Sequence, residues 1–294
     1  MEIDHIFFII NPSAGKHEPI LQNIADVFKD SPLKTTVHVL KKDQDAAEIT
    51  RMASQPGTLI AIYGGDGSVT EAAAALINTP VPLAIIPGGT ANVLSKELNI
   101  PQDVEAALNL LKDGNYEFTT IDTGTVNGRP FLLRINLGIM AEMITDTDPD
   151  LKEKIGQLAY GVATVKSVLN AEQMSYHLNI DGQEFDTDGV ALTITNCGSM
   201  GIGQLQIVSG ISIADGLLDV VLMKDASLLS IIKATGGALL GTETDAVEHW
   251  QGKNITVRMP GHQTYLCDDC EATADKLNIS VVPASLTVAV PLKT

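Results

Sequence analysis

A glycine-rich turn at residues 63–71 (Tyr-Gly-Gly-Asp-Gly-Ser-Val-Thr-Glu) constrains the fold of this chain more than any other stretch. It follows an apolar run of strand length, Thr58–Tyr63, and opens onto an alanine-rich stretch of helical character, Val69–Ile77. Glycines between a strand and a helix let backbone N–H groups approach phosphate oxygens without intervening Cβ atoms. Asp66 would repel phosphates unless a cation lies between them, and Mg²⁺ binds carboxylate and phosphate oxygens together. The turn therefore indicates a nucleotide-phosphate site; the alternative is an ordinary strand-to-helix connection in which Asp66 or Ser68 caps the helix.

Strand-like and helix-like segments alternate through the first third of the chain. Strands are expected at Ile3–Ile10, Thr35–Leu40, Thr58–Tyr63 and Leu83–Ile86, and helices at Ile20–Phe28, Ala46–Ala53, Val69–Ile77, Asn92–Leu98 and Val104–Leu111. Continuous apolar strands are typical of a parallel sheet covered by helices on both faces. Ligands of such sheets collect at the carboxyl ends of the strands, where the glycine-containing turns lie.

The pattern changes near Ile121. Asn127-Gly128 and Asp181-Gly182 separate strand-like runs and predict hairpin turns. Further strands are expected at 131–137, 176–180, 190–195, 217–223, 255–259, 277–282 and 286–290, with helices at 151–169 and 228–240. We therefore expect a nucleotide-binding α/β domain at residues 1–121 and an antiparallel β-sandwich at 122–294, with the last residues able to return to the first domain.

Charge and hydropathy exclude several classes of function. The formal net charge of -17 argues against nucleic-acid binding, which needs clustered Lys and Arg, and against tight adhesion to an anionic membrane. No apolar run approaches the roughly 18 residues that would span a bilayer, and the N-terminal stretch lacks the basic start of a signal peptide. These features favour the cytoplasm.

Two more turns and one acidic pair are candidates for chemistry. The turn at 11–16 (Asn-Pro-Ser-Ala-Gly-Lys) lacks Walker A spacing but can present a hydroxyl, N–H groups and a cation to a phosphate. In the turn at 87–92, Thr90 can contact a phosphate or ribose, and Asn92 can cap the next helix or contact the nucleotide. Asp269 and Glu271 would share one side of an extended chain, which suits one of them to accept a proton from a substrate hydroxyl. Ordinary turns, helix capping and an acidic surface turn are the alternatives.

Three cysteines fit a reducing compartment. Cys267 and Cys270 form a CxxC pair with His262 upstream as a conceivable third zinc ligand. Because a structural zinc site needs four ligands, a facultative disulfide stays open beside zinc.

Taken together, these stretches resemble the catalytic-domain superfamily of diacylglycerol kinases, and within it the bacterial soluble lipid kinases. The resemblance rests on Asn-Pro-x-x-Gly at 11–15, Gly-Gly-Asp-Gly-Ser at 64–68 with Glu71, Pro-x-Gly-Thr-x-Asn at 87–92, Asp-Gly-Leu-Leu-Asp at 215–219 and Asp-x-Glu at 269–271. It implies a Rossmann-like, three-layer α/β domain of the NAD-kinase and diacylglycerol-kinase type, joined to an antiparallel β-sandwich, with the active site in the cleft between the domains.

The resemblance also implies a role for each matching residue. The ATP-binding set would comprise Asn11, Pro12, Ser13, Ala14, Gly15, Gly64, Gly65, Asp66, Gly67, Ser68, Val69, Thr70 and Thr90, with Asn92 beside it, Asp66 serving phosphate and Mg²⁺, and Glu71 supporting the loop. Glu271, with Asp269 beside it, would deprotonate the lipid hydroxyl. A second, structural cation, magnesium or calcium, would be held by Asp215 and the backbone carbonyls of Ser212 and Leu217.

Four departures from the family pattern bear on activity. Ser68 replaces Thr but keeps a hydroxyl, and Met140 stands where Asp is common. Cys270 stands where the family has Gly, which would carry a penalty if that backbone needs a positive φ. The glycine cluster before the structural-cation segment is reduced to Gly201-Ile202-Gly203.

The sequence therefore predicts an ATP- and Mg²⁺-dependent kinase that phosphorylates a lipid hydroxyl of a diacylglycerol or a related glycerolipid or sphingoid lipid. Its partners would be the lipid and, transiently, a membrane surface, and an exposed sheet edge could support a homodimer. The nearly uncharged helix expected at Leu228–Leu240 could contact lipid, although a core-facing helix explains it equally. The rivals are NAD kinase, which shares Gly-Gly-Asp-Gly, and a nucleotide-binding regulatory protein that has lost catalysis.

Overall fold

A computed structural model describes residues 2–14, 19–141, 172–198, 208, 210–225 and 246–292. The chain forms two compact units, one made of Met1–Thr123 with Ala284–Thr294 and one made of Gly124–Pro283. Two long strands, β5 (Tyr116–Val126) and β14 (Cys270–Pro291), each begin in one unit and end in the other. The expected helices at 151–169 and 228–240 lie outside the described residues.

The first unit is built on a parallel sheet, as predicted. Its strands are β1 (His5–Ile10), β2 (Lys34–Val39), β3 (Thr58–Gly64) and β4 (Leu83–Pro87), in the order β4-β3-β1-β2. The last part of β14 joins this sheet, where Val288 pairs with Leu83 of β4. Every residue of β3 and β4 is buried, as expected for central strands covered on both faces.

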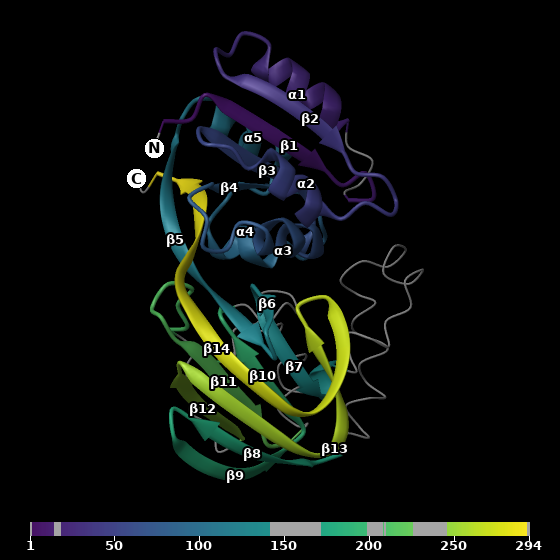
Figure 1. Cartoon of the computed structure of the whole chain (residues 1–294), viewed down its shortest axis with the longest axis vertical. Helices are drawn as coiled ribbons and strands as arrows, with labels where there is room; N and C mark the ends of the chain where they lie inside the picture. Colours follow the sequence, from purple (N-terminus) through teal and green to yellow (C-terminus); the bar gives the residue numbers. More distant parts are fainter. Residues whose placement is uncertain are drawn as a thin grey trace. The chain divides into compact units, whose positions relative to one another are not determined.

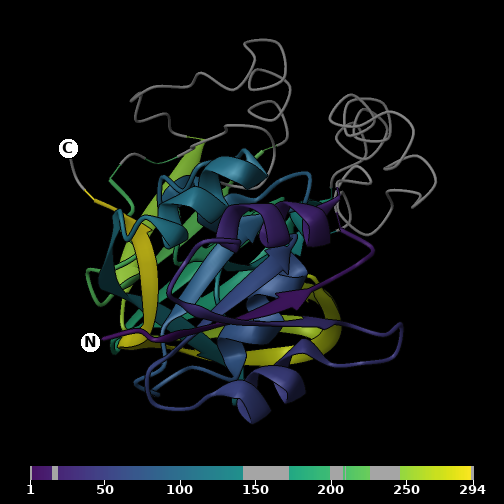
Figure 2. The same cartoon turned by 90° about the horizontal axis from the view of Figure 1, so that it is seen from above.

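Helices cover both faces of this sheet (Figures 1 and 2). They are α1 (Ile20–Phe28), α2 (Ala46–Ala53), α3 (Asp66–Ala74), α4 (Val93–Glu97) and α5 (Val104–Lys112). Helices α1 and α5 share one hydrophobic core with β1, β3 and β4, while α2 packs against α3. The Asp45 carboxylate accepts the Ala47 N–H at 2.8 Å, so Asp45 caps α2.

The second unit consists of antiparallel strands. They are β6 (Arg129–Phe131), β7 (Arg134–Gly138), β8 (Met174–Ile180), β9 (Gln183–Gly189), β10 (Ala191–Thr195), β11 (Leu218–Met223), β12 (Val247–Gly252) and β13 (Asn254–Cys267), with parts of β5 and β14. The strand order is β12-β11-β10-β7-β13-β14, with β8 and β9 attached to β13. Both predicted hairpin turns are present, and all four of their residues have positive φ: Asn127, Gly128, Asp181 and Gly182.

Three details differ from the sequence-based expectations. The expected strand at 131–137 is two strands, β6 and β7, separated by Leu132 and Leu133. The strands expected at 277–282 and 286–290 are one continuous strand, β14. Strands β5, β9 and β12 were not predicted; the sequences of β9 and β12 are polar and charged and lack a clear apolar run.

Among the described residues, no helix is long and apolar enough to cross a membrane.

The two strands shared by the units are bonded together where the chain re-enters the first unit. The Asp122 carboxylate accepts the Ala284 N–H at 2.6 Å, and the hydroxyls of Thr123 and Ser285 lie 2.8 Å apart. Ala284 has φ +46°, a left-handed conformation that is unfavourable for a residue with a Cβ atom.

We expect Ala284→Gly to stabilise the protein by about 0.5 kcal/mol. Relief of the left-handed strain, roughly 1–2 kcal/mol, exceeds the roughly 0.5–1 kcal/mol that glycine's extra freedom in the unfolded chain costs. Urea denaturation measures the change. Ala289→Gly is the matched control: Ala289 lies on the same strand, is buried and does not have a positive φ, so this change should destabilise. Equal losses of stability in both variants would contradict the assignment of strain to Ala284.

Candidate functional site

The three predicted turns follow three neighbouring strands of the first unit. The turn at Asn11 follows β1, the turn at Gly65 follows β3 and the turn at Gly88 follows β4. Because these strands are parallel and adjacent in the order β4-β3-β1, all three turns lie at one edge of the sheet. The structure therefore brings the predicted nucleotide-binding turns together.

Asn11 joins the first turn to the second. Its backbone N–H donates to the Tyr63 carbonyl at 3.0 Å, and its side-chain Nδ2 donates to Ser68 Oγ at 2.8 Å. Asn11 Oδ1 accepts the Ser13 N–H at 2.9 Å, which shapes the turn itself. The Ser68 hydroxyl is thus engaged within the protein. Pro12 and Ala14 belong to the same turn, and Gly15 lies outside the described residues.

The second turn is shorter than predicted because the helix begins at its aspartate. Gly64 is the last residue of β3, Gly65 is the N-cap and α3 starts at Asp66, three residues before the expected start at Val69. The capping alternative is wrong for Asp66 and Ser68, since no side chain caps α3. An uncapped N-terminus of a nine-residue helix leaves backbone N–H groups for an anion.

Asp66 instead caps the neighbouring helix. Its Oδ1 accepts the Val93 N–H at 2.7 Å and the Leu94 N–H at 3.4 Å, at the start of α4. This links the second turn to the third and holds the carboxylate in one orientation. Carboxylates that bind metal ions are commonly oriented by a hydrogen bond of this kind from a neighbouring donor.

Asn92 closes the third turn rather than capping α4. Its side-chain amide bonds the Gly89 backbone in both directions: Oδ1 accepts the Gly89 N–H and Nδ2 donates to the Gly89 carbonyl, each at 2.9 Å. Asn92 adopts the left-handed conformation, with φ +49°. The prediction that its side chain caps the next helix is wrong, and a contact of Asn92 with a nucleotide stays a prediction.

Glycines allow the second and third turns to touch. A Cβ atom at Gly89 would lie 2.5 Å from the Cα of Gly65, and one at Gly64 would lie 2.5 Å from the Cβ of Ser68. The Gly88 N–H donates to the Gly64 carbonyl at 2.9 Å. Gly89 is therefore required for contact between the two turns, and Gly64 for the close approach of Ser68 within the second turn. The sequence-based interpretation had explained the glycines by approach to phosphate alone.

The groups that line these turns suit a phosphate with a hard cation. Gly67 is half-buried beside Asp66, Thr90 and Glu71 are exposed, and the Val69 side chain is buried in the core. Thr70 lies one helical turn after Asp66, and its buried hydroxyl has no hydrogen-bond partner in the described part of the chain. The described residues contain no cluster of three His, Cys, Asp or Glu side chains. Any magnesium here would therefore depend on phosphate and water oxygens besides Asp66.

The predicted acidic pair lies on a hairpin in the second unit. Asp268 and Asp269 form the two-residue turn between β13 and β14, and Glu271 is the second residue of β14. The expectation that Asp269 lies in an extended chain is wrong, because it is a turn residue; both Asp269 and Glu271 are exposed. That this pair shares one cleft with the three turns stays a prediction.

The carboxylate that shapes this hairpin is Asp268, for which no role was predicted. It is buried and accepts the N–H groups of Leu132 at 2.8 Å and of Leu133 and Arg134 at 2.9 Å. Burial raises the pKa of the Asp268 carboxyl, and the three N–H donors act in the opposite direction. Three acidic residues within four positions, 268–271, could not reveal which carboxylate is buried.

Glu271 shares one face of its sheet with buried polar residues that were also missed. Leu266 pairs with Glu271 on one side and with Asn136 on the other, so these three side chains point to the same face. Thr193 Oγ1 donates to Asn136 Oδ1 at 3.0 Å, while Asn136 Nδ2 is buried without a partner among the described residues. The alternation Arg-Ile-Asn-Leu at 134–137 was the available signal, and it had been used only to predict a strand.

Asp219 is a second buried acceptor on this face. Its Oδ1 lies 2.6 Å from His249 Nε2 and accepts from Gln251 Nε2 at 3.0 Å. Asp219 is 1% exposed, and in the described residues Oδ2 has no partner. A donor at Asn136 and an acceptor at Asp219 are the kind of groups that bind hydroxyl and carbonyl oxygens of a substrate.

The predicted structural-cation residues lie in the loop before β11. Leu217 N–H donates to Asp215 Oδ1 at 3.0 Å, and Ala214 N–H donates to Ser212 Oγ at 3.3 Å. Asp215 is exposed. A cation held by Asp215 and the carbonyls of Ser212 and Leu217 stays a prediction. Met140 is buried, and Gly201-Ile202-Gly203 lies outside the described residues.

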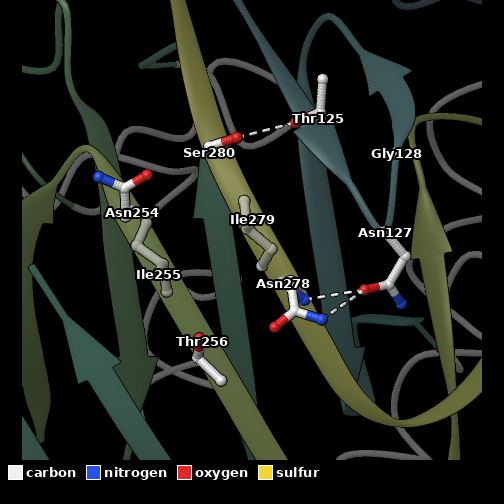
Figure 3. Close-up of a pocket in the computed structure, with 9 residues that line it drawn as sticks. All are labelled: Thr125, Asn127, Gly128, Asn254, Ile255, Thr256, Asn278, Ile279 and Ser280. Atoms are coloured by element: carbon white, nitrogen blue, oxygen red, sulfur yellow. Dashed lines mark hydrogen bonds between the residues drawn. The ribbon is translucent and has the colours of Figure 1, made fainter.

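A shallow groove of about 670 Å³ lies on the sheet formed by β5, β13 and β14 (Figure 3). Its lining is neutral, since no titratable side chain contributes: Thr125, Asn127, Gly128, Asn254, Ile255, Thr256, Asn278, Ile279 and Ser280. The polar side chains largely bond each other, as Thr125 Oγ1 does with Ser280 Oγ at 2.9 Å. The groove therefore offers no group for acid–base chemistry.

Two variants of Asp66 separate its structural role from its charge. Asp66→Ala should cost about 1 kcal/mol of stability, the usual effect of losing a helix cap. Asp66→Asn keeps a capping oxygen and should stay within about 0.5 kcal/mol of the unchanged protein. Thermal unfolding without nucleotide measures both, and equal losses in the two variants would contradict a capping role.

Asp268→Asn should destabilise the protein by about 1–3 kcal/mol, because an amide nitrogen would face backbone N–H donors that the carboxylate now satisfies. Asparagine tolerates the φ of +49° found at this position, so backbone strain is not added. Asp269→Asn, one residue along the same turn, is the control and should change stability by less than about 0.5 kcal/mol. Chemical denaturation compares them; a loss confined to Asp269→Asn would refute this account of the hairpin.

Comparison with known proteins agrees with this architecture. The profile of the diacylglycerol kinase catalytic domain matches residues 5–126, and that of the YegS C-terminal NAD kinase beta sandwich-like domain matches residues 135–290. A diacylglycerol kinase of Bacillus subtilis is 29% identical over 240 residues, covering 79% of this chain and 78% of the relative. One of Mycobacterium tuberculosis is 29% identical over 258 residues, covering 84% and 82%.

Solved structures show the same fold. A protein of Bacillus anthracis superposes with a TM-score of 0.86 at 24% identity, covering 99% of this chain and 97% of the other. A diacylglycerol kinase of the same organism gives a TM-score of 0.77 at 20% identity, covering 99% and 98%. With both family profiles matched in order along the chain, the protein belongs to the diacylglycerol kinase family, and its two-domain fold is the one predicted from its sequence.

Proposed function

We propose that the protein transfers the γ-phosphate of ATP to the hydroxyl of a lipid, with a diacylglycerol or a related glycerolipid or sphingoid lipid as acceptor. One observation carries the proposal: three turns after adjacent strands are bonded into one surface through Asn11 and Asp66, while Asn92 closes the third turn. Family membership supports kinase chemistry, and the relatives named diacylglycerol kinase support a lipid acceptor.

In this proposal the first unit binds the triphosphate. The uncapped N-terminus of α3 would donate backbone N–H groups to phosphate oxygens, and the hydroxyls of Thr70 and Thr90 would add two more donors. Asp66 would hold Mg²⁺ while its Oδ1 stays bonded to α4, so the carboxylate needs no reorientation when the nucleotide arrives. When bound, the ion would neutralise the charge that develops on the transferred phosphoryl group.

The second unit would supply the base. Glu271 is exposed and lies two residues beyond a turn that Asp268 holds in place, so its backbone is positioned while its side chain can reach an acceptor hydroxyl. Asn136 and Asp219 lie on the same face and would bind other oxygens of the acceptor's polar end. Positioning and charge neutralisation would dominate catalysis, as in other phosphoryl transfers.

Glu271→Gln should lower turnover at least about 100-fold, because it removes the general base, and leave ATP affinity nearly unchanged. The assay is transfer of radiolabelled phosphate from ATP to diacylglycerol in mixed micelles, with nucleotide binding measured separately. Glu184→Gln, also an exposed glutamate of the second unit, is the control and should keep full turnover. Unchanged turnover in Glu271→Gln would remove Glu271 from the base role.

The same assay distinguishes the rivals. NAD⁺ offered in place of lipid should remain unphosphorylated; its conversion would favour a NAD kinase. A regulatory protein without catalysis would be stabilised by ATP but label no lipid. That rival was motivated partly by Cys270, yet Cys270 does not have a positive φ, so the expected backbone penalty does not arise.

A further inference from the structure

The CxxC pair flanks the turn that precedes Glu271. Cys267 is the last residue of β13, Cys270 is the first residue of β14, and the two are direct partners in the antiparallel register. Both thiols are free, and the described residues contain no metal-binding cluster that would engage them as zinc ligands. The zinc interpretation of this pair, with His262, therefore has no structural support in the described part of the chain.

The register satisfies the geometry of a disulfide. Directly opposed residues of an antiparallel pair have Cα atoms about 4.5–5.5 Å apart, inside the range of about 4.4–6.8 Å found for bridged cysteines. Opposed side chains also point to the same face of the sheet. The hydrogen bonds of Asp268 to Leu132 and Leu133 hold the turn that joins the two cysteines.

The two thiols differ in reactivity. Cys270 is exposed, whereas Cys267 is buried. Burial raises the pKa of Cys267 to about 12; the charge of Asp268 and the neighbouring Cys270 act in the same direction, and Arg129 acts against them. An oxidant therefore meets Cys270 first, and Cys267 reacts second.

We propose that Cys267 and Cys270 are a redox-modification site that closes into a reversible disulfide in the presence of a small-molecule disulfide such as oxidised glutathione. In the first step the Cys270 thiolate attacks the oxidant, forming a mixed disulfide and releasing one reduced glutathione. In the second step the Cys267 thiolate attacks the Cys270 sulfur and releases the other glutathione. The protein loses two electrons and two protons, and one glutathione disulfide becomes two thiols.

Formation of the Cys267–Cys270 disulfide would change the position of the neighbouring carboxylates. The ring contains Asp268 and Asp269, and Glu271 follows directly. A disulfide fixes the backbone and side-chain angles of Cys270, and with them the direction in which Glu271 leaves the turn. This consequence rests on the proposed function, whereas the disulfide itself does not.

The disulfide is tested by peptide mapping of the full chain equilibrated in glutathione buffers from reduced to oxidised, followed by alkylation of free thiols. We expect oxidised buffer to yield a cross-linked Cys267–Cys270 peptide lighter by two hydrogen atoms, and dithiothreitol to restore both alkylation sites. Persistence of two free thiols, a lasting mixed disulfide at Cys270, or linkage to Cys197 would overturn the proposal.

Three variants locate the chemistry. Cys270→Ser should abolish cross-linking, Cys267→Ala should stop at the mixed disulfide, and Cys197→Ala should cross-link like the unchanged protein. If the buried Cys267→Ala fails to fold, the exposed Cys270→Ser tests the same pair. Because Cys267 must ionise, closure should accelerate about tenfold per pH unit between pH 7 and 9; a rate that ignores pH would overturn the assignment of Cys267 as the second thiol.

Lipid phosphorylation tests the consequence separately. Oxidation should lower kcat about tenfold, since small misplacements of a reacting group are costly, and Cys270→Ser should be insensitive to oxidant. Equal turnover of the two redox forms would refute the regulatory effect. Absence of any lipid phosphorylation in the reduced protein would refute the proposed function while leaving the mapped disulfide as found.

Discussion

The contact between two glycine-rich turns is the constraint on which the candidate site of the first unit depends. A Cβ atom at Gly89 would lie 2.5 Å from the Cα of Gly65, so the turns after β3 and β4 can meet only because side chains are absent there. Asp66 then bonds across this contact to Val93, and Asn11 bonds from the other side to Ser68. Three separate strand ends become one surface through backbone contact and two polar side chains.

In the second unit, a buried aspartate joins segments that are far apart in the sequence. Asp268 binds the N–H groups of Leu132, Leu133 and Arg134, which are 134 to 136 residues away in the sequence. Those N–H groups are consequently withdrawn from the strand ladder, which explains why the run from 131 to 137 is interrupted. The cost of burying the carboxylate is offset by three hydrogen bonds, and the hairpin that carries Glu271 is fixed as a result.

Local signals predicted the elements of the first unit well and its site less well. Helix α2 begins and ends where expected, because Asp45 caps it and its apolar positions recur with helical spacing. Helix α3 begins three residues before the expected start, because Gly-Asp-Gly has poor helix propensity and so gave no local signal for a helix there. Asn92 was expected to cap α4 or to contact the nucleotide, but the side-chain cap of α4 comes from Asp66, a residue on another turn.

The sequence by itself determined the alternation of strands and helices up to α5, the hairpins at Asn127-Gly128 and Asp181-Gly182, and the family, because periodicity, turn residues and short ordered motifs are properties of neighbouring residues. Only the tertiary structure decided which polar atoms are engaged and which are buried without partners. It buried Asp268 and left Asp269 exposed. It placed Asn136 and Asp219 on the face of the sheet that carries Glu271. It paired Cys267 with Cys270 across the hairpin. These outcomes depend on strand register and on contacts between residues far apart in the chain, which local patterns do not encode.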